Sequence, residues 1–91
     1  MYDKSTFFGI DAQQSRQHAR AMRTGAGQLD GIVGQIGSLL DSVQWSGPGA
    51  DRFVGEWSGA LRPELRAAAE NIRQNSVELD RRAQMQEDAS R

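Results

Sequence analysis

The side chains best suited to chemistry are few in this 91-residue chain, and their spacing does not group them. The sequence has no cysteine, which excludes disulfides and thiolate metal sites. His18 is the only histidine, so no imidazole pair can hold a metal or relay a proton. Carboxylates are plentiful, but none has a nucleophile, a base and a pocket-forming context around it. We therefore expect no enzymatic activity, no metal and no cofactor, and we interpret His18 as a partly buried spacer in a helix.

The charge pattern excludes two further classes of function. The 11 basic and 12 acidic residues give a net charge of −1, and the basic residues are scattered, whereas nucleic-acid binding needs a concentrated positive face. No apolar run reaches the ~20 residues of a membrane span, and the N-terminus lacks the layout of a cleaved signal peptide. Membrane contact is not expected either, because no strongly basic amphipathic helix supports a membrane-perturbing effector.

The most informative spacing lies in the middle of the chain, where Trp45 and Gly47 precede a proline. Glycine accepts backbone angles that a side chain forbids, and Pro48 suits the first position of a helix, where its missing N–H would have had no partner. Ser46 or Gly47 can then act as the N-cap, and Asp51 places a carboxylate in the positive first turn. The stretch therefore predicts a turn followed by a helix.

With the turn at residues 44–48, the helix that follows is predicted over 49–84, with a flexible tail at 85–91. Its apolar residues recur every three or four positions and resemble a heptad seam, which implies a shallow crossing angle with a neighbouring helix. Pro63 removes a backbone hydrogen bond and should bend the helix near 59–62, with a full break as the alternative. The expected packing residues are Ala50, Phe53, Trp57, Leu61, Leu65, Ile72 and Leu79, with Ala68, Asn75 or Ser76, and Ala83 in the same register.

A first helix is predicted over residues 10–43, after an N-terminal arm at 1–9. Five glycines inside it each cost about 1 kcal/mol relative to alanine, so we expect them to serve close packing of two helix backbones. The alternative is a break at 24–27 that would give two shorter helices. The predicted seam and partner interface consists of Met22, Leu29, Ile32, Ile36, Leu39, Leu40 and Val43, and its register extends back through Gly25 or Ala26, His18 or Ala19, and Ser15.

These two helices predict an all-α fold, an antiparallel two-helix hairpin in a single domain over 1–91. Two long helices leave each other's outer faces bare, and Val33, Val54 and Val77 also lie off the main seam. Pairing with a second hairpin into a four-helix bundle would cover these surfaces. We therefore expect the chain to be half of a dimer.

The pattern of Trp45 and Gly47, followed by Ala50, Phe53 and Trp57, in a chain of about a hundred residues resembles the WXG100 family. These are the small ESAT-6-like and CFP-10-like substrates of bacterial type VII (ESX-like) secretion systems. The resemblance covers nearly the whole chain. It implies a helical hairpin that pairs with itself or with a sister protein and is secreted folded, without a cleaved signal peptide. It also implies engagement of the secretion ATPase by the dimer, with Trp45 and Gly47 in the turn that contributes to the export signal.

The sequence departs from the family at the second half of that signal, a tyrosine followed four positions later by an acid in the partner's C-terminal tail. The only tyrosine is Tyr2, and Thr6 follows it at that spacing. This departure favours the ESAT-6-like member of a heterodimer, exported with a CFP-10-like sister that carries the tail. A homodimer, a chain truncated at its C-terminus, or a targeting adaptor that pairs with the helical leader of a larger secreted toxin are the alternatives.

Overall fold

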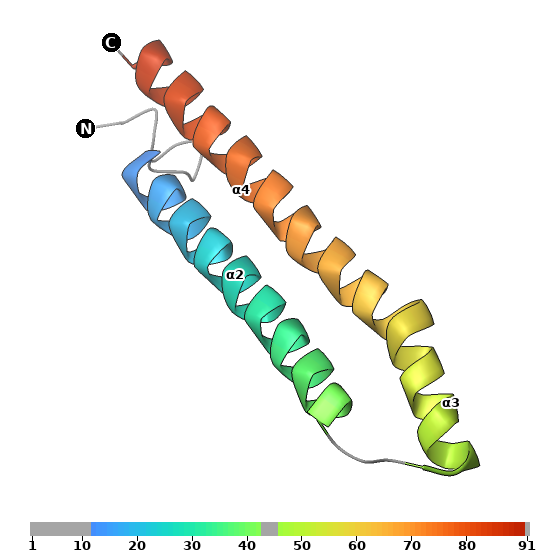
Figure 1. The fold of residues 1–91 in the computed structure, drawn as a ribbon. Coiled ribbons are helices and arrows are strands. Elements are labelled where there is room, and N and C mark those ends of the chain that lie inside the picture. The colour runs from blue at the N-terminus through green and yellow to red at the C-terminus, as the bar shows by residue number, and fades with distance from the viewer. Residues whose placement is uncertain (1–11, 43–45, 91) are drawn as a thin grey trace. The chain divides into compact units, whose positions relative to one another are not determined.

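The first helix of the hairpin runs without interruption through the glycine-rich half of its sequence. The structure is a computed structural model that describes residues 12–42 and 46–90, and in it α2 spans Ala12–Ser42 (Figure 1). The alternative break at 24–27 does not occur. The predicted arm at 1–9, the ends of the predicted helix at residues 10 and 43, and Trp45 lie outside the described residues.

The second helical stretch has three parts that follow one another directly. Helix α3 spans Pro48–Glu56, a π-helical turn η1 spans Trp57–Leu61, and α4 spans Arg62–Ala89. The prediction of a flexible tail from residue 85 is wrong as far as Ala89, because the helix continues to that residue. Glu87 in this extension accepts a hydrogen bond from Arg16 of α2, which ties the last turns of α4 to the hairpin.

Pro63 explains the π-helical turn. Proline lacks the N–H that an α-helix needs at each interior position, and its ring crowds the carbonyl four residues earlier. The backbone N–H of Arg62 donates to the carbonyl of Trp57, five residues back, so the chain widens just before the proline (Figure 1). A π turn of this kind inserts one residue into an otherwise regular helix. The full break, which was the alternative to the predicted bend, does not occur, and the helix changes type locally instead.

The inserted residue moves the buried face of the helix. Three regular turns after Trp57 need about 11 residues, which would bring Ala68 onto the face of Trp57. The structure buries Ala69 completely and leaves Ala68 exposed, one residue later than the predicted register. Ser76, which the sequence left open beside Asn75, is buried seven residues after Ala69, and Ala83, as predicted, is buried seven residues after Ser76.

The described residues fall into two compact units, each made from a segment of α2 and an antiparallel segment of the second helical stretch. Unit 1 comprises 12–24 and 71–90, and unit 2 comprises 25–42 and 46–70. The chain is thus an all-α antiparallel two-helix hairpin. Whether it also forms a single domain stays a prediction.

Small side chains form most of the buried interior of both units. Unit 1 buries Ala12, Ser15, Ala19, Ser76 and Ala83, and unit 2 buries Ala26, Val33, Trp57 and Ala69. On each helix most of these positions are seven residues apart, which is the heptad spacing of a coiled-coil seam. Alanine and serine at such positions leave room only for a closely approaching neighbour. Ser76 is buried without cost to its hydroxyl, which donates to the carbonyl of Arg73 at 2.6 Å.

This small-residue seam corrects three expectations. Val33, expected off the seam, is 1% exposed and belongs to the interior of unit 2. Ile32 and Leu39, expected in the seam, lie on a flank of α2 and are exposed. His18 is exposed as well, because Ser15 and Ala19 take the buried positions of its turn. Ile32 and Leu39 were expected inward because the apolar residues of the first helix recur every three or four positions, whereas most buried positions of the heptad seam hold small residues.

Candidate interaction surface

The turn before α3 depends on one glycine. Gly47 has φ 109° and ψ 165°, the only positive φ among the described residues, and this region of backbone space is open essentially to glycine alone. It is the N-cap of α3, without a side-chain capping bond, and its carbonyl accepts the Asp51 N–H at 3.1 Å. Pro48 occupies the first turn, as does the Asp51 carboxylate. Gly47 therefore sets the direction in which the chain enters α3.

Trp57 is the largest side chain in the interior of unit 2. It is 5% exposed, and its indole Nε1 is buried with no hydrogen-bond partner among the described residues. A buried donor of this kind costs about 1–3 kcal/mol, so the burial of the ring must outweigh that cost. Trp57 is the one aromatic residue of the predicted packing set that the structure places in the interior.

The helix that leads to Trp57 is exposed except at Ala50, which is half-buried. None of the residues of α3 is buried, and Phe53 and Val54 are each 39% exposed, as Leu61 of η1 is at 40%. Burial of Phe53 and Leu61 within the hairpin was expected and is not found, whereas Val54 was expected off the seam.

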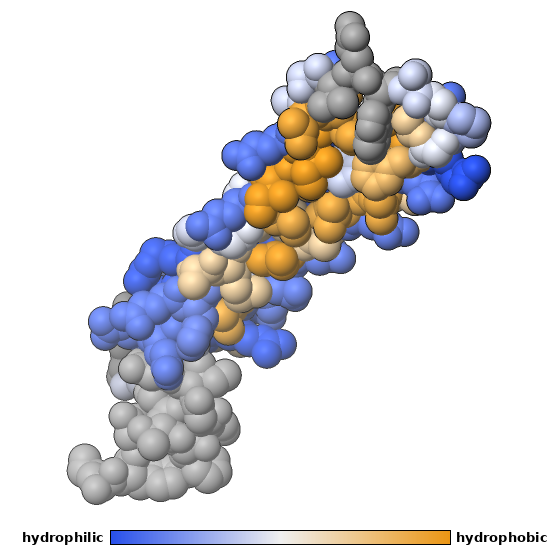
Figure 2. Space-filling view, turned by 90° about the horizontal axis from the view of Figure 1, so that it is seen from below, coloured by the Kyte–Doolittle hydropathy of each residue, from blue (hydrophilic) through white to orange (hydrophobic). Residues whose placement is uncertain are grey.

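Exposed apolar side chains are concentrated in unit 2, and Figure 2 shows apolar residues gathered over one part of the surface. On α2 they are Ile32 and Leu39, the latter 62% exposed. Unit 1 exposes only Val77 and Met85 among the described large apolar residues. Large exposed apolar residues grouped in this way mark an interaction surface more often than a solvent face. They suggest a protein partner.

A shallow groove runs along α2 beside Leu39. Its lining is Gly31, Gly34, Gln35, Ser38, Leu39 and Ser42, all from this one helix. Glycine and serine leave the helix backbone nearly bare here. A side-chain Cβ built at Gly31 or Gly34 would meet nothing within 4 Å, so packing inside the hairpin does not require either glycine. The expected role of the glycines in close packing of the two hairpin helices is therefore not found at these positions.

Unit 1 is linked across its two helices by ion pairs. Arg16 pairs with Glu87 and also donates to Gln84 Oε1 at 3.0 Å, and Arg23 Nη1 lies 2.8 Å from Asp80 Oδ2. These pairs are partly exposed, and such pairs stabilise a protein by only about 0–1 kcal/mol each. Their main effect is therefore on the register of the two helices, and their contribution to the stability of the pair is small.

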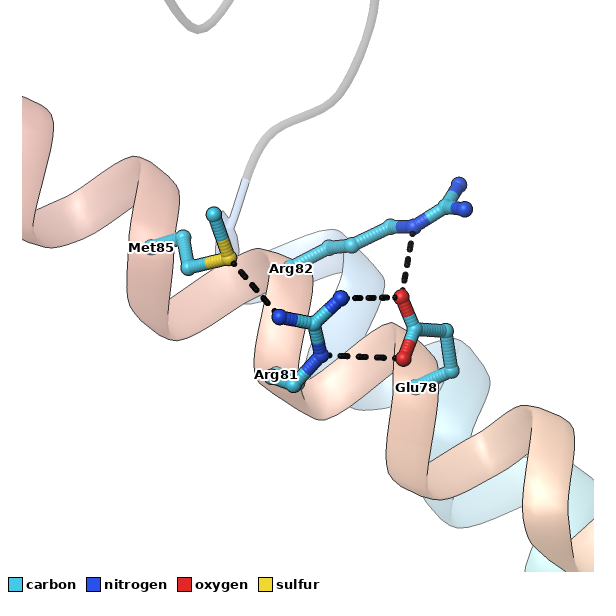
Figure 3. A network of polar contacts seen from close by, with 4 residues as sticks. All are labelled: Glu78, Arg81, Arg82 and Met85. Atoms are coloured by element: carbon cyan, nitrogen blue, oxygen red, sulfur yellow. Dashed lines mark hydrogen bonds and ion pairs between the residues drawn. The ribbon is translucent and has the colours of Figure 1, made fainter.

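A second polar network lies on α4 alone (Figure 3). Glu78 accepts hydrogen bonds from the guanidinium groups of Arg81 and Arg82, and Arg81 also approaches the sulfur of Met85 at 3.3 Å. The hydrogen bonds from Arg81 and then Arg82 lower the pKa of Glu78 to about 2. The hydrogen bonds of this network are exposed, so it is typical of a solvated helix face.

The remaining predicted packing residues are half-buried. Met22 of α2 and Leu79 of α4 line one small groove in unit 1, together with Asn75, Glu78 and Arg82. The others are intermediate in burial: Leu29, Ile36, Leu40, Ala50, Leu65 and Ile72. Trp45 and Val43 fall outside the described residues.

No group of His, Asp or Glu side chains in ranges 12–42 and 46–90 could hold a metal ion. Over those same ranges, no helix combines the length and the apolar character that crossing a membrane requires. Comparison with protein-family models, curated proteins and solved structures found no match to this chain. The size and hairpin fold are consistent with the WXG100-like resemblance, which rests on the residues of the central turn.

Proposed function

We propose that this chain is a small secreted substrate of a bacterial type VII secretion system, in which it acts as a helical-hairpin subunit of a dimer. The observation that carries the proposal is the turn. A tryptophan, a spacer and a glycine precede a helix, and the glycine holds a backbone conformation that other residues adopt only under strain. In the WXG100 family this turn contributes to the export signal.

The exposed apolar residues of unit 2 support the dimer in this proposal. Phe53, Val54 and Leu61 lie on α3 and η1, directly after the turn, and each keeps about two fifths of its surface exposed. A partner that covers this surface would also lie beside the turn. The only tyrosine of the sequence, Tyr2, is followed at the family's spacing by Thr6 and not by an acid, and on this departure we propose that the chain is the ESAT-6-like member and that a CFP-10-like sister supplies the tail.

The mechanism is recognition by surface display, without catalysis by this chain. Trp57 anchors the π turn η1 in the interior of unit 2, and Gly47 fixes the entry into α3. The partner's tail completes the surface that the secretion ATPase binds. Export would then leave the hairpin folded.

Replacing Trp45 with alanine tests the proposal, with secretion into the medium and thermal melting measured on the same variant. We expect secretion to fall to background while the melting temperature of the dimer with the proposed CFP-10-like sister changes little. His18→Ala, an exposed change in unit 1, is the control and should be secreted normally. Normal secretion of the Trp45→Ala protein would refute the export role, and loss of folding would show that Trp45 acts through packing.

A further inference from the structure

Met85 is the methionine that lies most in solvent among the described residues. It is 55% exposed on α4, whereas Met22 of α2 is half-buried and lines the small groove of unit 1. Peroxides oxidise the thioether of methionine to a sulfoxide, and this reaction needs access of the oxidant to the sulfur. Of these two sulfur atoms, the one in Met85 is therefore the one that an oxidant reaches first.

A guanidinium group is already in place beside this sulfur (Figure 3). Nη1 of Arg81 lies 3.3 Å from Sδ of Met85, while Nε and Nη2 of the same group donate to the Glu78 carboxylate at 2.9 and 2.7 Å. Arg81 thus uses two nitrogens for Glu78 and a third for Met85. Because a thioether is only a weak acceptor, the third nitrogen makes a much weaker bond than it could.

Oxidation of Met85 would give that nitrogen a strong acceptor. A sulfoxide is polar where the thioether is apolar, and its oxygen carries partial negative charge. Hydrogen bonds from an ionised donor are roughly twice as strong as those between neutral groups. The methionine side chain is flexible, so the new oxygen can turn toward Nη1 of Arg81 without a movement of the backbone. Since Nε and Nη2 already bind Glu78, Arg81 need not leave the carboxylate to bind the sulfoxide.

We propose that Met85 is an oxidation site for peroxides, and that Arg81 binds the sulfoxide oxygen while it keeps its pair with Glu78. In the reaction a lone pair of Sδ attacks one oxygen of hydrogen peroxide, and the S–O bond forms as the O–O bond breaks. The transferred oxygen gives its proton to the departing hydroxide, which leaves as water. Sulfur is oxidised and the peroxide is reduced.

The modified residue lies in the turns of α4 that are tied to α2. Arg16 of α2 donates to Gln84 and to Glu87, which precede and follow Met85 on α4. A methionine sulfoxide commonly disrupts apolar packing. Here the oxidised side chain would instead be held by a polar network that is already formed, so we expect the hairpin to stay folded. Oxidation would also make polar one of the two large apolar residues that unit 1 exposes, leaving Val77.

The first test is the order in which the methionines are oxidised. The full chain is treated with a low excess of hydrogen peroxide, and the sulfoxide at each methionine is quantified over time by mass spectrometry of its peptides. We expect Met85 to be oxidised at least about threefold faster than Met22, because its side chain is more exposed. Equal rates, or faster oxidation of Met22, would overturn the assignment of Met85 as the site.

The second test measures whether Arg81 binds the oxidised side chain, which exposure alone would not produce. By NMR we expect the guanidinium N–H signals of Arg81 to shift and to exchange more slowly with water after oxidation, while Glu78 still titrates near pH 2. Met22→Leu should leave this response intact, and peroxide treatment of Met85→Leu should leave the Arg81 signals unmoved. Arg82→Gln is the matched control: Arg82 also donates to Glu78, at 3.2 Å, and its loss should leave the response of Arg81 to oxidation in place.

Two NMR results would overturn the role of Arg81. Guanidinium signals that oxidation of Met85 leaves unchanged would mean that water, and not Arg81, binds the sulfoxide. A titration midpoint of Glu78 that rises toward its ordinary value on oxidation would mean that Arg81 exchanges one partner for the other. Loss of helix content in circular dichroism on oxidation would equally contradict the proposal, because the network would then not hold the modified residue. None of these measurements involves export, so the oxidation site and the proposed function stand or fall separately.

Discussion

Replacing the outward glycines of α2 with alanine should stabilise the isolated chain. Gly27, Gly31 and Gly34 are exposed, and a Cβ at each would meet nothing within 4 Å. The change therefore gains helix propensity without a steric cost, by about 0.8–1 kcal/mol at each site. The three sites add to roughly 3 kcal/mol if they act independently, which for a domain of this size would raise the melting temperature by about 12 °C or more.

The assay is urea and thermal unfolding followed by circular dichroism, on the three single variants and the triple variant. Gly47→Ala serves as the opposite control, because its φ of 109° should make alanine cost about 1–3 kcal/mol. A triple variant no more stable than the natural chain would refute the reasoning. It would mean that another surface, present in solution, packs against these glycines even when the chain is alone.

Two further predictions follow from the register of α4 and from its polar network. Ala69→Leu should destabilise the hairpin by about 1–3 kcal/mol, because Ala69 is fully buried and the larger side chain has no room. Ala68→Leu, one residue earlier and exposed, should change stability by no more than about 0.5 kcal/mol. If urea unfolding showed Ala68→Leu to be the more destabilising variant, the register shifted by the π turn would be refuted. Glu78 should titrate by NMR near pH 2 rather than near 4.5, since its depressed pKa comes from Arg81 and Arg82. The stabilisation linked to Glu78 is then present above about pH 4.5 and is lost as the pH falls toward 2. Arg81→Gln should raise the titration midpoint of Glu78 toward its ordinary value. A Glu78 midpoint that Arg81→Gln leaves unchanged would show that the network does not form in solution.

The two units of the hairpin differ in how they are stabilised, and this difference bears on the proposed function. Alanine and serine hold the two helices of unit 1 close together, and exposed ion pairs fix their register. Unit 2 has the larger apolar residues but leaves several exposed. If a partner covers unit 2, binding would stabilise the half of the hairpin that carries the turn. Recognition of the turn would then depend on the partner, as expected for a substrate exported as a dimer.

The sequence by itself determined the local features of this protein. The Gly47–Pro48 pair predicts the turn and the start of α3, and the three-and-four spacing of apolar residues predicts two long helices. These features depend on backbone sterics and helix periodicity, which are determined by residues close together in the sequence. The absence of cysteine and of paired histidines likewise follows from composition alone.

Only the tertiary structure decided which residues face the interior. A missing N–H at Pro63 is visible in the sequence, but whether the chain bends, breaks or inserts a residue depends on which option preserves packing on both sides. The π turn shifts the register by one residue, so Ala69 is buried in place of Ala68. In the same way, hydrophobicity favours Ile32 and Leu39 for the seam, but a close approach of two backbones selects Ala26 and Val33. The distance between the helices is a property of the whole hairpin, and no short stretch of sequence specifies it.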